Sequence, residues 1–242
     1  CQKTASCQGI LTNVADRVDR GLMDGAPGLV VISEIAVGID NVALPEATKR
    51  NIAVGYTPGV LSEATADFAF ALLMAAGRRV VEADRWVRQG NWKVPWHPAY
   101  FLGHEVHGAT LGIVGLGKIG LEVAKRARGF DMKLLYSDPV RRQAEEERYG
   151  LRYVSLDELL RTADFVTLHT PLLPETHHII GEAQLRIMKP TAILVNASRG
   201  PIVDPRALYR ALKEGWIAGA ALDVTEPEPI PASDPLLALD NI

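Results

Sequence analysis

The second half of the chain alternates short apolar runs with amphipathic stretches, a pattern typical of parallel strands joined by helices. The apolar runs predict strands at 110–114, 133–136, near Tyr153, and at 165–169, 192–196 and 218–224. Helices are expected over 121–130, after the capping box that starts at Ser155, and after the cap Asp204. This alternation implies a parallel sheet covered by helices on both faces.

The first half of the chain predicts a smaller α/β layer of its own. Strand-like segments at 9–12, 28–33 and 51–55 alternate with helical stretches at 16–23 and 44–50. We expect Ser62 to cap one long helix, apolar on nearly every side over 64–76 and amphipathic from there to Gly90.

An aromatic and proline-rich segment, 92–101, fits neither a helix nor a strand and marks the expected domain boundary. We therefore expect a partial substrate domain with its long helix at 1–91, a connector at 92–106, and a dinucleotide-binding domain at 107–242.

Composition narrows the classes of partner. The 242 residues are 48% hydrophobic and 23% charged, which is typical of a soluble globular protein with room for two modest cores. The net charge of −3 supplies no basic field, so no nucleic-acid partner is expected. The longest apolar stretch, 68–77, has about half the length that a bilayer-spanning helix needs, so no membrane segment is expected.

Cysteine and histidine usage limits the chemistry. The two cysteines, Cys1 and Cys7, cannot build a disulfide framework, and a reducing, cytoplasmic setting is expected. The six histidines form no His-Glu-x-x-His arrangement, and no metal site is predicted.

The glycine sequence Gly115-Leu116-Gly117-Lys118-Ile119-Gly120 directly follows the strand predicted at 110–114. Its first glycine allows a tight turn, the second permits close approach of a pyrophosphate, and the third lets a helix pack on its strand. An acid, Asp138, closes the next predicted strand and can bind the ribose hydroxyls of NAD. The pattern therefore predicts a dinucleotide site.

Two alternatives bear on this loop. Residues 112–118 also contain most of a P-loop, but Ile119 stands where that motif needs a magnesium-binding hydroxyl. Asp138 favours NAD over NADP, whereas Arg141 and Arg142 lie close enough to accommodate a 2′-phosphate, so NADP stays possible.

In an open parallel sheet the ligand lies beyond the carboxyl ends of the strands. The residues that follow the predicted strands there are His169-Thr170-Pro171, Asn196-Ala197-Ser198-Arg199-Gly200, and Asp223 to Glu228. One arginine and several acids are thus expected to converge near a nicotinamide.

The chain resembles the NAD(P)-dependent D-2-hydroxyacid dehydrogenases, and in particular their glyoxylate and hydroxypyruvate reductase branch. The matching stretches, in order, are 36–41, 57–61, the glycine loop, 194–200, 222–224 and 226–229, and the resemblance covers almost every residue. It implies an α/β fold, a doubly wound parallel Rossmann sheet with a second, smaller flavodoxin-like substrate domain. It also implies a homodimer that acts on a small 2-oxoacid, with the aromatic connector facing the partner subunit, although a plain packing role for these aromatic residues is equally consistent.

The resemblance assigns roles to individual residues. Arg199 matches the arginine that holds the substrate carboxylate and polarises its carbonyl, and Glu228 matches the carboxylate that orients the catalytic histidine. Asp223 matches the contact to the nicotinamide carboxamide, and the backbone of Val37 and Gly38 matches the loop that receives the substrate carboxylate. The implied cofactor contacts are Gly115, Gly117, Lys118, Ile119, Gly120, Asp138, His169, Thr170, Pro171, Ala197, Ser198, Arg199 and Asp223.

Each role has a plainer alternative. Arg199 could brace the cofactor or form a surface ion pair, Glu228 could be a solvated loop acid, and Asp223 could cap its strand. The segment around Gly38 could be a simple turn. His169 is expected to be a wall of the cofactor pocket and not an acid.

The family's acid-base histidine lies in a Pro-His-Ile-Gly stretch, and none of this chain's histidines matches it, because the last one is His178. The absence of an initiating Met and the strand-like start at Asn241 suggest an internal portion of a longer polypeptide. The expected function is reduction of glyoxylate or hydroxypyruvate. Dehydrogenation of another D-2-hydroxyacid or of phosphoglycerate, or a non-enzymatic NAD-sensing role like that of the family's corepressors, remains open.

Overall fold

The computed structural model describes residues 5–242, so Cys1 lies outside the described residues. Its internal contacts divide the chain into two compact units, one ending at Leu61 and the other spanning Ser62–Ile242. The helix that begins at Ser62 was expected in a first domain that ends at residue 91, whereas it packs against the second unit's helix α5 (Lys118–Ala127) and strands β8 (Ile193–Asn196) and β9 (Gly219–Leu222).

The first unit is a small parallel α/β layer. Its elements are β1 (Gly9–Thr12), α1 (Arg20–Asp24), β2 (Val31–Glu34), α2 (Leu44–Lys49) and β3 (Ala53–Gly55). The strands lie in the order β1-β2-β3, and all are parallel. Ile32 of β2 is fully buried with Val18 and Met23 in a core of its own. The three expected strands and two helices are confirmed; β1 has the expected bounds, and the ends of the other four elements differ from those expected by at most four residues.

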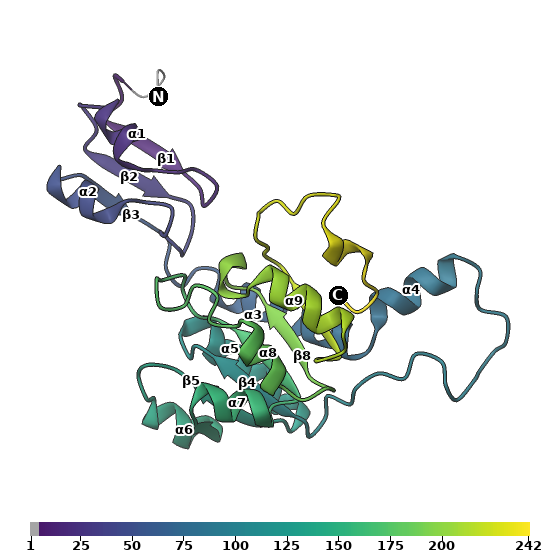
Figure 1. The fold of residues 1–242 in the computed structure, drawn as a ribbon. Coiled ribbons are helices and arrows are strands. Elements are labelled where there is room, and N and C mark those ends of the chain that lie inside the picture. Colours follow the sequence, from purple (N-terminus) through teal and green to yellow (C-terminus); the bar gives the residue numbers. More distant parts are fainter. Residues whose placement is uncertain (1–4) are drawn as a thin grey trace. The chain divides into compact units, whose positions relative to one another are not determined.

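The second unit contains a six-stranded sheet in the order β6-β5-β4-β7-β8-β9. The strands are β4 (Thr110–Val114), β5 (Lys133–Ser137), β6 (Leu151–Tyr153), β7 (Phe165–Leu168), β8 (Ile193–Asn196) and β9 (Gly219–Leu222). Every pairing is parallel. The chain moves outward from β4 in one direction to β6 and returns to the other side of β4 at β7, so the order reverses beside β4 (Figure 1). This reversal is the crevice where doubly wound sheets bind ligands.

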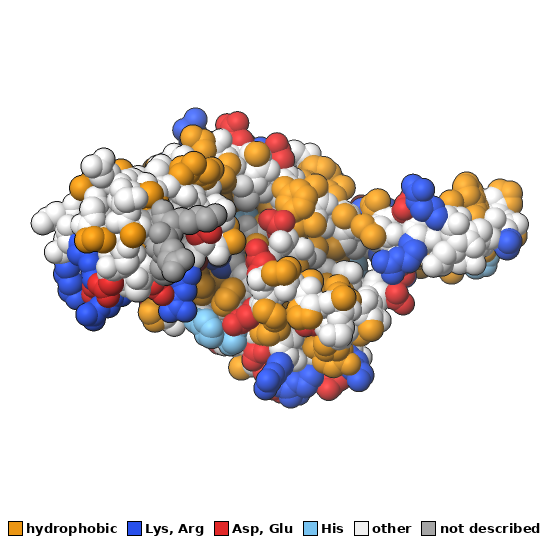
Figure 2. Space-filling model, turned by 90° about the horizontal axis from the view of Figure 1, so that it is seen from above, with side chains coloured by type: hydrophobic (Ala, Val, Ile, Leu, Met, Phe, Trp, Pro, Cys, Tyr) orange, Lys and Arg blue, Asp and Glu red, His pale blue; other side chains and the backbone are white. Residues whose placement is uncertain are grey.

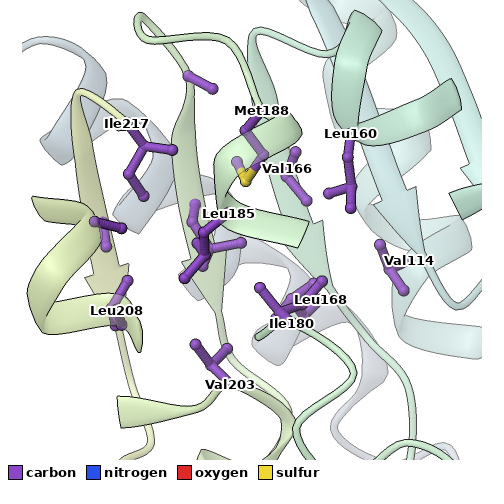
Figure 3. Close-up of a cluster of buried hydrophobic side chains, with 14 of the residues drawn as sticks. Val114, Leu160, Val166, Leu168, Ile180, Leu185, Met188, Val203, Leu208 and Ile217 are labelled. Atoms are coloured by element: carbon purple, nitrogen blue, oxygen red, sulfur yellow. The ribbon is translucent and has the colours of Figure 1, made fainter. Parts of the chain in front are cut away.

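Helices cover both faces of this sheet. They are α3 (Ser62–Gly77), α5 (Lys118–Ala127), α6 (Gln143–Tyr149), α7 (Leu156–Thr162), α8 (Glu182–Ile187) and α9 (Pro205–Lys213), whereas a further helix, α4 (Val80–Arg88), has no buried residue. Short 3-10 turns lie at Arg128–Phe130, Gly200–Ile202 and Pro235–Ala238. Figure 3 shows the core on one face, to which α7, α8 and α9 contribute Leu160, Leu185 and Leu208, and β7 contributes Val166 and Leu168.

Successive side chains of a strand point to opposite faces of the sheet, so each strand contributes to both hydrophobic cores. Ile193 and Val195 belong to the core beneath α3 and α5, whereas Leu194 between them belongs to the core beneath α7, α8 and α9. Because both faces are buried, the strands read as continuous apolar runs rather than alternating ones. The doubly wound parallel sheet expected from these runs is confirmed.

The expected single helix from Ser62 to Gly90 is wrong, because the structure breaks it into α3 and α4. Arg79 at the break has a φ of 54°, in the left-handed region, and its side chain pairs with Glu82 of α4. His104 N–H, near the end of the connector, donates to the Gly77 carbonyl at 2.8 Å and so caps the buried carboxyl end of α3. Ser62 is the first residue of α3 rather than a cap outside it.

The aromatic connector forms neither helix nor strand, as expected, and it projects with α4 from the second unit (Figure 1). Helices α6 and α8 were not predicted.

Among residues 5–242, no helix combines the length and hydropathy needed to cross a bilayer. Figure 2 shows acidic and basic side chains interspersed over the visible face.

Candidate active site

The glycine loop joins β4 to α5 at the point where the strand order reverses. Gly115 has a φ of 91°, and a Cβ atom there would lie 2.8 Å from the carbonyl carbon and oxygen of His169. A Cβ on Gly120 would lie 2.2 Å from the Gly115 carbonyl oxygen. Beside Gly117, in contrast, a Cβ would meet nothing within 4 Å. Two of the glycines are therefore required by packing, and the third borders open space at the start of α5.

Asp138, after β5, holds the glycine loop in place. One carboxylate oxygen accepts the backbone N–H of Leu116 at 2.8 Å, and the other accepts the N–H of Val140 at 2.8 Å. The carboxylate is half-buried, and each oxygen keeps a further lone pair for another donor. The acid is thus fixed at the end of its strand, where hydroxyl donors of a ribose could reach it.

His169, after β7, has one ring nitrogen enclosed without a partner. Its Nε2 lies 2.8 Å from the Thr167 hydroxyl, whereas Nδ1 is shut off from solvent and bonds to none of the residues that the structure describes. Burial lowers the pKa of His169 from 6.5 to about 4. The imidazole is therefore neutral at pH 7 and cannot serve as the acid of a reaction at that pH.

Replacing His169 with glutamine is expected to flatten the acid limb of the stability profile. The unfolded chain protonates His169 near pH 6.5 and the folded chain only near pH 4, so unfolding becomes easier as the pH falls through this window. The wild type should lose about 2–3 kcal/mol of unfolding free energy there through this residue, and none above pH 6.5. Urea unfolding at pH 7 and pH 4.5 measures the difference between wild type and variant.

The matched control is His107→Gln, since the His107 side chain is 66% exposed. That variant should follow the wild-type profile. An equally steep acid limb in His169→Gln would contradict the buried, neutral assignment.

Arg199 stands on a turn that the side chain of Asn196 shapes. Asn196, the last residue of β8, is 1% exposed. Its amide oxygen accepts from the backbone N–H of Ser198 at 3.1 Å and from the Ser198 hydroxyl at 2.8 Å. Its amide nitrogen donates to the Arg199 carbonyl at 2.8 Å. The turn is thus held by a buried amide, and the half-buried Arg199 side chain leaves it beyond the carboxyl end of β8.

The loop after β9 packs directly on this turn. A Cβ on Gly200 would lie 1.9 Å from the Thr225 carbonyl oxygen, so only glycine fits after Arg199. Glu228, on the same loop, is exposed and accepts the Thr225 N–H at 3.3 Å. Asp223 is also exposed, and its N–H donates to the Asn196 carbonyl at 2.9 Å.

In the first unit, the loop that follows β2 carries Val37 and Gly38, both half-buried. Neither of their N–H groups donates to another of the described residues. Beneath the loop, the Glu34 carboxylate is 1% exposed and accepts from the Thr12 hydroxyl at 2.5 Å and the Asn41 amide at 3.3 Å. The loop is therefore anchored at both ends, with two backbone donors left for a ligand.

The second unit brings most of the expected site residues to one edge of its sheet. Gly115, Gly117, Gly120, Asp138, His169, Thr170, Pro171, Ala197, Ser198, Arg199, Asp223 and Glu228 all follow the carboxyl ends of β4, β5, β7, β8 and β9 or open α5. Lys118 is exposed at the first position of α5, and Ile119 packs into the core beneath that helix. A dinucleotide fits this edge, because Gly117 leaves open space at a helix start and His169 offers an enclosed nitrogen.

Two supporting residues were not predicted. Asn196 was noted only as part of a motif, and Glu34 was not singled out. A polar residue ending a buried strand is a usable signal for Asn196. Glu34 has no comparable local signal, because its role depends on Thr12 and Asn41 across the layer.

Comparisons with known proteins agree with this geometry. The family model described as "D-isomer specific 2-hydroxyacid dehydrogenase, NAD binding domain" matches residues 70–242. Glyoxylate reductase from Korarchaeum cryptofilum is 58% identical over 241 residues, covering 100% of this chain and 73% of that protein.

Two solved structures have the same fold. D-lactate dehydrogenase from Aquifex aeolicus, complexed with NAD and lactic acid, superposes with a TM-score of 0.91 at 33% identity, over 99% of this chain and 75% of that one. A glyoxylate reductase from Paecilomyes thermophila gives a TM-score of 0.88 at 36% identity, over 99% and 73%.

Proposed function

The chain belongs to the D-isomer-specific 2-hydroxyacid dehydrogenases, and on that premise we propose that it reduces glyoxylate or hydroxypyruvate with NADH. The observation that carries the proposal is Arg199, held by the buried Asn196 amide at the edge of the sheet that also bears the glycine loop. The bound nicotinamide supplies a hydride to the carbonyl carbon.

The chain's own residues bind and polarise the substrate. The Arg199 guanidinium presents a fork of donors that suits both a carboxylate and the oxygen of an adjacent carbonyl. In the first unit, the N–H groups of Val37 and Gly38, which donate to none of the described residues, would suit a carboxylate. A positive charge beside the carbonyl oxygen stabilises the negative charge that develops as hydride arrives, and it does so more in the transition state than in the ground state.

The proton follows a separate route. His169 is neutral and enclosed, so it serves as a wall of the cofactor pocket. We assign the proton to the family's acid-base histidine, with Glu228 as the exposed carboxylate that would orient it and favour its protonated form. Asp223 would accept from the nicotinamide carboxamide.

NADH is the preferred donor in this proposal. Asp138 would accept the ribose hydroxyls and repel a 2′-phosphate. Of the two arginines that could reverse the preference, Arg141 already pairs with Glu146 through two contacts of 2.9 Å. Its charge is therefore partly neutralised, which weakens the case for NADP.

Turnover by the full-length protein tests the function. NADH consumption is followed with glyoxylate, hydroxypyruvate and pyruvate in parallel, and NADPH is offered as a second donor. Rapid consumption with either of the first two, faster with NADH, is expected. No consumption with any of the three, despite demonstrable NADH binding, would favour a non-enzymatic NAD-sensing scaffold.

The proposal also covers the cellular compartment and the oligomeric state. Every residue of α4 is at least partly exposed, and Trp92 and Trp96 of the connector are 57% and 77% exposed. Aromatic side chains presented in this way are enriched at subunit interfaces. We propose that the protein lies in the cytoplasm and forms a homodimer through α4 and the aromatic connector.

A further inference from the structure

Two histidines and a glutamate meet where the loops after β7 and β9 lie together. The His178 Nε2 atom lies 2.6 Å from one Glu226 carboxylate oxygen, and the His177 Nε2 atom lies 3.9 Å from the other. The two imidazole rings stack with centroids 3.9 Å apart and planes inclined at 29°. One donor atom from each of the three residues lies within 4.8 Å of the other two.

The backbone under the histidines is fixed by its own hydrogen bonds. The Thr176 hydroxyl donates to the Pro171 carbonyl at 2.7 Å and accepts the Leu173 N–H at 2.8 Å. The His178 N–H donates to the Pro201 carbonyl at 2.8 Å. The two imidazoles are therefore presented from a turn whose shape does not depend on any ligand.

The opposite side of the cluster is equally constrained. Glu226 follows Thr225, whose carbonyl oxygen fills the space that a side chain on Gly200 would need. The Thr225 hydroxyl donates to the Pro227 carbonyl at 2.9 Å. The carboxylate thus reaches the histidines from a second loop that is packed independently.

We propose that His177, His178 and Glu226 form a binding site for Zn²⁺. Two imidazole nitrogens and a carboxylate oxygen are a donor set that suits Zn²⁺ and related transition metals, whereas Mg²⁺ and Ca²⁺ prefer oxygen ligands. The side chains of the three residues are 50%, 33% and 33% exposed, so an ion can enter and water can complete the coordination.

Metal binding requires a small rearrangement. Tetrahedral Zn²⁺ with bonds of about 2.0–2.2 Å holds its ligand atoms roughly 3.4 Å apart. The His178 and Glu226 donors, 2.6 Å apart, must therefore separate, whereas the His177 nitrogen must approach Glu226 and the stacked rings must open. His177 is free to turn, because it is half-exposed and lies 3.9 Å from the carboxylate. The ion would take the place of the proton between His178 and Glu226.

The sequence predicts no metal because its histidines lack a helical ligand spacing. The cluster instead combines neighbouring histidines with a glutamate 48 residues away from His178. None of the three residues has a role in the proposed reaction, so the site can be tested without turnover.

Calorimetric titration of the full-length protein with ZnCl₂, and separately with MgCl₂, tests the site. We expect one Zn²⁺ per chain with micromolar affinity, no comparable Mg²⁺ binding, and a higher melting temperature with Zn²⁺ present. His177→Gln and Glu226→Gln should each weaken Zn²⁺ binding at least about tenfold, since even changes behind a ligand cost that much. The double variant His177→Gln/His178→Gln should abolish it.

His177→Gln separates ligation from packing, because the His177 imidazole is beyond hydrogen-bond distance of Glu226. Its melting temperature without Zn²⁺ should match the wild type while its Zn²⁺ affinity falls. His97→Gln, in the exposed connector, should leave Zn²⁺ binding unchanged. The proposal is overturned if the wild type shows no saturable Zn²⁺ binding, or if stoichiometric binding survives in the double variant.

Discussion

Replacing Arg199 with alanine is expected to lower kcat/KM for glyoxylate by about 10³-fold or more, while NADH affinity stays within about threefold. Removing a single donor from a developing oxyanion commonly costs about 10²–10³ in rate, and this change removes two functions. It deletes the charge that binds the substrate carboxylate and the donor that polarises the carbonyl. Steady-state kinetics and an NADH fluorescence titration measure the two quantities on the same preparation.

The position of Arg199 explains why the loss should be confined to chemistry. The turn is shaped mainly by the buried Asn196 side chain, which bonds to the backbone of Ser198 and Arg199, and the guanidinium adds a bond from its Nη1 to the Ser198 carbonyl at 2.9 Å. The glycine loop and Asp138 belong to other strands. Removing the Arg199 side chain should therefore leave the fold and the cofactor contacts in place.

Two further variants sharpen this test. Arg199→Lys keeps the charge but loses the planar fork, so its kcat/KM should lie between those of the wild type and the alanine variant. Arg206→Ala, on the exposed side of α9, should behave as the wild type. Turnover of Arg199→Ala within tenfold of the wild type would contradict the catalytic role, and loss of NADH binding would instead indicate a residue that braces the cofactor.

The sequence predicts the sheet well because its strands are buried on both faces. A strand such as 193–196 contributes alternate residues to two cores, so apolar residues run without interruption and need no periodicity to be recognised. Helix starts with a side-chain cap were also predictable. The Ser155 hydroxyl accepts the Glu158 N–H at 3.2 Å, and the Asp204 carboxylate accepts two N–H groups of α9.

The missed helices lack the features on which sequence prediction depends. Helix α6 consists mainly of polar residues, and its side chains are exposed or half-buried, so it has no apolar stripe. Helix α8 has six residues and follows Gly181, which has no side chain to cap it, whereas the equally short α2 carries a proline in its first turn. The break between α3 and α4 depends on His104, which bonds to Gly77 from the far side of the connector.

In the candidate site, too, features set by local sequence could be predicted, whereas features set by distant contacts could not. The positions of Asp138 and Arg199 just beyond β5 and β8 could be predicted, because the carboxyl ends of parallel strands share one edge, whereas the roles of these residues stay predictions. Contacts between side chains far apart in sequence could not. The pairing of His178 with Glu226 and the enclosure of Glu34 beneath the Gly38 loop depend on how separate strands and loops come together.

Replacing Gly120 with alanine is expected to destabilise the protein by about 3 kcal/mol or more, a drop in melting temperature of roughly 10 °C. Glycine-to-alanine changes inside helices normally stabilise by up to about 1 kcal/mol, so the expected sign is reversed. The cause is the Gly115 carbonyl oxygen, which would lie 2.2 Å from the new Cβ. Backbone cannot yield as a flexible side chain would, so α5 and the glycine loop must separate.

Gly117 offers the complementary change within the same loop. Its φ of −75° accepts alanine, and a Cβ there would meet no atom within 4 Å. Gly117→Ala should therefore keep its melting temperature within about 2 °C. If the open space receives a pyrophosphate, the variant should still bind NADH at least about tenfold more weakly, a loss of about 1.4 kcal/mol.

Gly129→Ala is the control for both glycine variants, because Gly129 is exposed and a Cβ there would also meet nothing within 4 Å. It should change neither the melting temperature nor the NADH affinity. Thermal unfolding followed by circular dichroism and NADH fluorescence titration distinguish the three variants. A Gly120→Ala protein as stable as the wild type would contradict the close helix–loop packing, and unchanged NADH affinity in Gly117→Ala would show that the cofactor phosphates bind elsewhere.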